Sequence, residues 1–162
     1  SSLLLVANGT DLLSTFGTEM PYIEPVVGDD FHGGEIGIQG TRSADVLKLW
    51  LGLRQLGEMG IQSLLEDSIH RRKMFQEMLD TSKFKIASGP LHLIAVTPKN
   101  IDNDSVSRWS IETRKKLLEE GFMLSRPYYY GSYYLKVVLG NPHTKLYHLE
   151  KLSEILNNSV VL

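Results

Sequence analysis

One stretch constrains the fold of this chain more than any other: a helical pattern over about residues 46–56 that is apolar on nearly every side. A helix of this kind is buried on most of its surface. Ser43 can cap its start, and Asp45 would then lie in the first turn, where a carboxylate interacts favourably with the helix dipole. The apolar residues that define the pattern are Val46, Leu47, Leu49, Trp50, Leu51, Leu53 and Leu56.

A second helical pattern follows at about residues 61–80, after interruptions at Gly57 and Gly60. Its apolar residues recur close to helical spacing. The basic run His-Arg-Arg-Lys at 70–73 lies across its polar side. We interpret this run as a solvated face rather than as a binding patch.

The first residues of the sequence also carry more apolar surface than a short chain can easily bury. Residues 2–7 are predicted to form a strand that is apolar at consecutive positions, which is typical of a sheet covered on both faces. Few other strands are available to surround it, so we expect the chain to be part of a larger protein. The irregular, glycine-rich stretch at 17–42 is predicted to be a functional loop, where the backbone approaches a ligand or another subunit closely.

The second half of the chain predicts a more self-contained unit. We expect a small antiparallel sheet with helices packed on one side, an α+β layer. Its elements are, in order, strands at 84–88 and 91–97, a helix that ends at Glu120 before Gly121, strands at 122–125 and 133–139, and a final helix after a turn at 141–144.

Composition excludes several classes of function. The net charge of −2 gives no indication of a nucleic-acid partner or an acidic membrane surface. Without cysteine, the chain has no disulfide framework, thiolate metal site or cysteine nucleophile, which fits a cytoplasmic location. No apolar run reaches the roughly 18 residues of a membrane span. The five histidines are scattered, so no metal site is expected.

Two motifs resemble a known family. The segment GTRSADVLKLWLGLRQLG at 40–57 and the segment LKVVLGNPHT at 135–144 are similar to signatures of the group II pyridoxal-phosphate (PLP) dependent amino-acid decarboxylases. That family includes the glutamate, aromatic-amino-acid and 2,4-diaminobutyrate decarboxylases. The opening strand also resembles the family's strand that follows the cofactor lysine.

The resemblance implies the C-terminal portion of a PLP-dependent transferase fold of the aspartate aminotransferase type, acting as a homodimer on a small amino-acid substrate. Residues 1–80 would then be the end of the large PLP-binding α/β domain, with an active-site loop and connecting helices. Residues 81–162 would be the small C-terminal α+β domain.

Arg42 is the first candidate site residue. A guanidinium between a glycine-rich loop and a helix start offers a fixed fork for a carboxylate. The resemblance implies that Arg42 binds the substrate carboxylate. The residues alone favour a structural role, in which Arg42 ties the loop to a backbone carbonyl or to an acid such as Asp45. The resemblance also implies that Gly40 and Thr41 approach the cofactor phosphate, the alternative being an ordinary turn before a helix.

Tyr22 is the candidate catalytic acid. In the family, a tyrosine on the loop after the opening strand protonates the carbanion left by the departing carbon dioxide, and a phenol suits that role. Pro21, directly before it, departs from the family's pattern. The alternative is a tyrosine that packs in an interface.

The family's cofactor lysine follows a histidine upstream of the opening strand, and every lysine here lies in another context. Lys48 matches a family lysine but lies within the apolar helix. We therefore expect a carboxy-lyase parent and a fragment that is inactive alone. The alternative is a stand-alone α+β binding or interaction module without catalysis. The tyrosines at 128–134 are interpreted as strand and interface packing rather than as an RNA-stacking platform.

Overall fold

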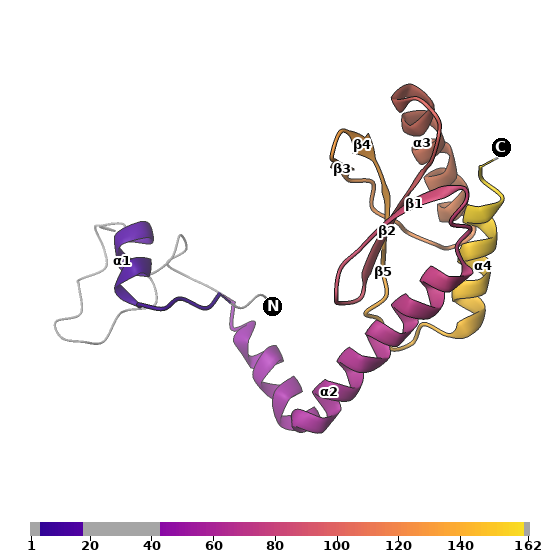
Figure 1. Ribbon diagram of the computed structural model, residues 1–162. Coiled ribbons are helices and arrows are strands. Elements are labelled where there is room, and N and C mark those ends of the chain that lie inside the picture. The colour runs from indigo at the N-terminus through magenta and orange to yellow at the C-terminus, as the bar shows by residue number, and fades with distance from the viewer. Residues whose placement is uncertain (1–3, 18–42, 161–162) are drawn as a thin grey trace. The chain divides into compact units, whose positions relative to one another are not determined.

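The structure, a computed structural model, describes residues 4–17 and 43–160 (Figure 1). The chain divides into two compact units, residues 1–57 and residues 58–162. The division expected from the sequence at residues 80 and 81 concerns the domains of a larger protein and stays a prediction.

The described N-terminal residues contain one short helix, α1 (Thr10–Phe16), which the sequence did not indicate. The Asn8 side chain accepts a hydrogen bond from the backbone N–H of Thr10 at its start. The strand expected at 2–7 is wrong over the described residues 4–7, which are irregular and exposed. A strand requires a neighbour to pair its backbone, and no described segment pairs with these residues.

Helix α2 (Val46–Met78) contains both of the expected helical patterns. Gly57 interrupts it, with φ 64° and ψ −176°, a backbone conformation open to glycine and disfavoured for other residues. The expected break at Gly57 is therefore confirmed. The break expected at Gly60 is wrong, because that residue stays in the helix.

A three-stranded antiparallel sheet forms the centre of the second unit, in the order β1 (Phe84–Ser88), β2 (Leu93–Pro98) and β5 (Leu135–Val138). Ile94 and Val96 of β2 point into the core, whereas Leu93 is 41% exposed. This alternation follows from the two-residue period of a strand. Strands β1 and β2 occur where the sequence predicted them.

Helix α3 (Asn103–Glu119) begins and ends at the expected signals. The Asp102 carboxylate accepts the N–H of Ser105 at 2.9 Å, as a helix cap does. After the helix, Gly121 has φ +85°, the N–H of Phe122 donates to the Leu117 carbonyl, and the N–H of Gly121 donates to the Leu118 carbonyl. This pair of bonds is a Schellman motif, and it explains why a glycine stands there.

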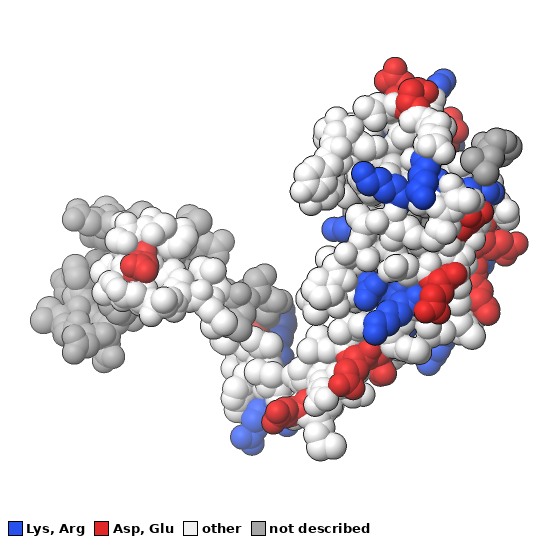
Figure 2. Space-filling view, viewed as in Figure 1, with Lys and Arg blue, Asp and Glu red and all other residues white. Residues whose placement is uncertain are grey.

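The segment after α3 differs from the prediction. Residues 122–125 form a single bridge, between Ser125 and Lys136, instead of a full strand. The strand expected at 133–139 is divided into β5 and part of a separate hairpin, β3 (Tyr128–Tyr129) with β4 (Ser132–Tyr133). The tip residues Tyr130 and Gly131 both have positive φ, 46° and 75°, as a two-residue hairpin turn requires. The hairpin presents a largely uncharged surface (Figure 2).

Helix α4 (Leu146–Asn157) completes the unit. Helices α3 and α4 cover one face of the sheet (Figure 1), so the expected α+β layer is confirmed. The Asn157 side chain accepts the N–H of Asp80 and donates to the carbonyl of Met78, both at 2.9 Å, which ties the end of α4 to the end of α2. The largest fully buried core side chains are Phe75, Phe84, Ile94, Leu117, Leu135, Leu149 and Leu156.

Candidate functional site

The four residues predicted to act in catalysis or binding lie outside the described residues. They are Tyr22, the predicted proton donor, Arg42, the predicted carboxylate ligand, and Gly40 and Thr41, the predicted phosphate contacts. Their roles stay predictions. The nearest described residues are Ser43 and those that follow it.

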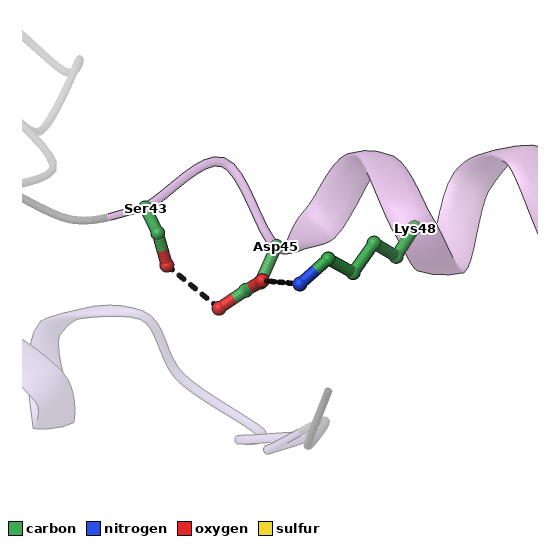
Figure 3. Close-up of polar contacts among 3 residues, drawn as sticks. All are labelled: Ser43, Asp45 and Lys48. Carbon is green, nitrogen blue, oxygen red and sulfur yellow. Dashed lines mark hydrogen bonds and ion pairs between the residues drawn. The ribbon is translucent and has the colours of Figure 1, made fainter.

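Three polar residues immediately after this segment contact one another (Figure 3). The Ser43 hydroxyl donates to the Asp45 carboxylate at 2.6 Å, and the Lys48 ammonium contacts the other carboxylate oxygen at 2.5 Å. The hydrogen bond from Lys48, followed by that from Ser43, holds the pKa of Asp45 below its usual value. Lys48 therefore stabilises the carboxylate of Asp45, a residue three positions before it in the chain.

The expected helix cap is wrong in its detail. Helix α2 begins at Val46, so Asp45 precedes the helix instead of lying within its first turn. The Ser43 hydroxyl bonds to the Asp45 side chain and not to a helix N–H. The chain needs two more residues than expected to turn into the helix, because the N–H of Asp45 first bonds to the Ser43 carbonyl at 2.8 Å.

The N-terminal half of α2 exposes an apolar surface. Trp50 is 52% exposed and Leu51 is 56% exposed, so the described residues of the first unit do not provide the burial expected for this helix. A surface of this kind marks an interaction site. We call it the apolar helix surface, formed by Val46, Leu47, Leu49, Trp50, Leu51, Leu53 and Leu56.

The basic run on the second half of α2 is only partly solvated. His70 and Lys73 are exposed, as expected. Arg71 and Arg72 are half-buried, and the expectation is wrong for them. Arg71 Nε donates to the Leu139 carbonyl at 3.1 Å, and Arg72 Nε donates to the Leu91 carbonyl at 2.9 Å.

These two arginines thus hold the helix against the start of β2 and the end of β5. The stems of arginine pack well against an apolar core while the head groups satisfy free carbonyls. No local sequence signal indicates such a role, because the carbonyls lie 68 and 19 residues away in the chain.

The described part of the chain shows no group of three histidine or acidic side chains placed to hold a metal ion. None of the helices within it is long and apolar enough to cross a membrane. The residues predicted to contact PLP all lie outside the described ranges, so no contact of this chain with the cofactor is described.

Comparison with known proteins identifies the fold. No protein-family model matches the sequence, and no curated protein matches it. Tryptophan decarboxylase from Catharanthus roseus, solved with L-tryptophan, superposes with a TM-score of 0.63 at 23% identity, over 78% of this chain and 29% of that one. Mouse CSAD in its apo form has a TM-score of 0.67 at 16% identity, over 94% of this chain and 34% of that one.

A bacterial structure is also similar. The glutamate decarboxylase domain of a diaminobutyrate-pyruvate transaminase and L-2,4-diaminobutyrate decarboxylase from Vibrio parahaemolyticus has a TM-score of 0.57 at 18% identity. The match covers 74% of this chain and 26% of that one. The chain therefore spans about a third or less of the solved structures that it matches.

These matches define the class of structure. The described residues have part of the fold of the PLP-dependent decarboxylases, and the resemblance predicted from the two motifs is confirmed at the level of the fold. The expected fold class, a portion of a PLP-dependent transferase fold with a small mixed domain, is confirmed with it.

Proposed function

We propose that this chain forms the C-terminal part of a PLP-dependent L-amino-acid decarboxylase. One observation carries the proposal: a chain with the motifs at 40–57 and 135–144 has the fold of solved decarboxylases that differ widely in sequence from it. The local sequence motifs and the three-dimensional arrangement thus indicate the same class of enzyme. The substrate is a small amino acid, and the proposed location is the cytoplasm.

The proposed chemistry divides between cofactor and protein. PLP, when bound, supplies the electron sink for the loss of carbon dioxide. Arg42 binds a substrate carboxylate through its planar, two-donor edge. Tyr22 donates a proton to the α-carbon after carbon dioxide has left, in a site that a closed loop shields from water. Gly40 and Thr41 offer backbone and hydroxyl donors to the cofactor phosphate.

The apolar helix surface supports an assembly role. Leu47 is 53% exposed, Trp50 is 52% exposed and Leu51 is 56% exposed. Exposing apolar surface to water costs roughly 25 cal/mol of free energy per Å². We propose that another part of the decarboxylase covers it, either the rest of the large domain or the partner subunit of a homodimer.

The decisive experiment measures carbon dioxide release from a panel of L-amino acids in the presence of PLP. It compares this 162-residue chain with a longer polypeptide that also carries the large domain. We expect release only from the longer protein, because no lysine of this chain stands in the family's cofactor context. Activity of the chain alone would contradict its proposed dependence on the large domain, and no activity from either would contradict the proposed function.

Variants at Arg42 test the assigned role. In the longer protein, Arg42→Ala should lower kcat/KM by about 10- to 100-fold, the value of a charge-assisted hydrogen-bond pair, and Arg42→Lys should restore part of it. Arg108→Ala is the matched control, because Arg108 on α3 is exposed and, among the described residues, hydrogen-bonds only to the Ser105 hydroxyl. Equal activity of the Arg42→Ala and Arg108→Ala variants would contradict the proposed role of Arg42 in binding the substrate carboxylate.

A stand-alone binding module is not favoured, since the structures that this fold matches include several decarboxylases.

A further inference from the structure

A pocket of about 310 Å³ opens at the edge of the core of the second unit, between residues 121–124, β5 and the start of α4. Its floor is apolar and belongs to the core, with the buried side chains Leu124, Leu149 and Leu152. Its volume is at the lower end of the roughly 300–1,000 Å³ typical of small-molecule sites, so its ligand is small. The polar side chains of the lining are Asn141, His143, Thr144 and His148.

The amide of Asn141 has a defined orientation. Its Oδ1 accepts the backbone N–H of His143 at 3.0 Å. An amide nitrogen cannot accept that bond, so the oxygen must face the backbone. The NH₂ group of Asn141 is therefore the part of the side chain that remains for a ligand.

A backbone hydrogen bond also defines the orientation of the His148 ring. Its Nδ1 accepts the backbone N–H of Lys145 at 2.9 Å. Only a ring nitrogen without a proton can accept, so the proton of the neutral imidazole is on Nε2. His148 therefore has a hydrogen-bond donor left over, like Asn141.

The lining is thus rich in donors and free of negative charge. Thr144 adds a hydroxyl that can also donate. Among the described residues that line the pocket, none carries a carboxylate. A head group that accepts hydrogen bonds matches this rim, and an aliphatic tail matches the leucine floor.

We propose that this pocket binds a short aliphatic carboxylate, with its tail on Leu124, Leu149 and Leu152 and its head group at Asn141 and His148. The site is independent of the proposed decarboxylase activity, since it uses none of the residues assigned to that reaction.

The first test varies the head group at constant tail. Hexanoate, hexan-1-ol and hexylamine are titrated separately into the full chain at neutral pH, and amide shifts are followed by ¹H–¹⁵N correlation NMR. We expect hexanoate to shift the amides of residues 141 and 143–149 with a saturable curve. Hexan-1-ol should bind at least about tenfold more weakly, because hydrogen bonds to a charged group are stronger, and hexylamine should not bind there.

The second test converts donors to acceptors without disturbing the backbone bonds. In Asn141→Asp, an oxygen still accepts the N–H of His143. In His148→Glu, a carboxylate still accepts the N–H of Lys145, since glutamate is the common residue at this capping position. Each variant should weaken hexanoate binding about tenfold or more, by replacing a donor with a negative charge. Asn103→Asp on α3, outside the pocket, is the matched control and should bind like the unchanged chain.

Three results would overturn the proposal. The first is equal affinity for the alcohol or the amine, and the second is no shift of the pocket amides at the solubility limit of hexanoate. The third is unchanged hexanoate affinity in both variants. The head-group series on the unchanged chain decides the question by itself if either variant fails to give the dispersed spectrum of a folded protein.

Discussion

The N-terminal half of α2 and helix α3 both carry exposed leucines, yet they differ in what covers their other apolar residues. In α3, Leu117 is fully buried while the next residue, Leu118, is 56% exposed, so the helix has one face in the core and one in water. In the N-terminal half of α2, apolar residues surround the helix, and Leu47, Trp50 and Leu51 are all more than half exposed. A helix with one apolar face is completed by its own domain, whereas a helix that is apolar all round requires a second surface.

The largest difference between the two regions should appear in stability. Leu117→Ala should lower the free energy of unfolding by about 2–5 kcal/mol, because it leaves a cavity in a packed core. Leu51→Ala should change it by less than about 0.5 kcal/mol. Urea denaturation measures both variants by two signals. Far-ultraviolet circular dichroism reports the helices of both units, and the fluorescence of Trp109, which packs against Phe84, reports the second unit in a chain that carries Trp50→Phe.

Leu118→Ala is the control for this pair, since it makes the same change one position along the same helix. It should behave like the variant at residue 51. A loss of several kcal/mol from Leu51→Ala would show that the apolar helix surface is already packed in this chain.

The second prediction concerns association. Leu47→Glu combined with Leu51→Glu should shift the chain toward monomer in analytical ultracentrifugation, because it removes apolar contact and adds like charges. The unfolding free energy should stay within about 0.5 kcal/mol, as for other exposed positions.

The same charge change on α3 provides the comparison. Ile111→Glu with Leu118→Glu alters two residues that are 55% and 56% exposed, and it should leave association unchanged. If this control dissociates the chain and the first pair does not, association uses the second unit instead of the apolar helix surface.

A smaller effect is expected where α2 and α4 are joined. Asn157→Ala leaves the N–H of Asp80 and the carbonyl of Met78 without their partner, and should cost about 1–3 kcal/mol. The neighbouring Asn158 is exposed, so Asn158→Ala should be close to neutral. Urea denaturation of the two variants measures the difference, and similar values for both would remove Asn157 from the account of how the second unit is held together.

The smallest effect is a pH dependence at the start of α3. Hydrogen bonds from the Ser105 hydroxyl and then its backbone N–H hold the pKa of Asp102 below its ordinary value of 3.8. The ionised form is therefore favoured by folding, so its contribution is complete above pH 3.8 and is lost as the pH falls through the lower folded value.

Asp102→Asn keeps an oxygen that can accept the helix N–H but does not titrate. The urea midpoint of the unchanged chain should therefore fall more steeply with decreasing pH below 3.8 than that of the variant. Parallel pH profiles would mean that the folded and unfolded states bind this proton equally.

Local signals explain which elements could be predicted from the sequence. Asp102 and Gly121 fix the limits of α3, because a cap and a left-handed glycine act on their own neighbours. The hairpin at β3 and β4 was missed for the opposite reason: its turn places a tyrosine, Tyr130, at φ 46°, where asparagine or glycine is usual.

Features that depend on distant residues could not be predicted. The carbonyl contacts of Arg71 and Arg72 and the pocket near His148 each join segments far apart in the chain. The exposure of the apolar helix surface could not be predicted from the sequence. An apolar pattern indicates that a surface should be covered, but it does not identify the residues that cover it. Tyr22 and Arg42 rest on the family resemblance, and their geometry lies outside the described residues.

Hydrogen–deuterium exchange of the backbone amides tests the central claim most directly. In this chain alone, at a concentration where ultracentrifugation shows a monomer, the amides of residues 47–56 should exchange far faster than those of the core around Leu117 and Leu149, because the apolar helix surface is then uncovered. In a longer polypeptide that carries the rest of the proposed large domain, the same amides should become protected while those of α3 and α4 stay as they were. Equal protection of residues 47–56 in both proteins would contradict the claim that this helix is completed by another part of the proposed decarboxylase.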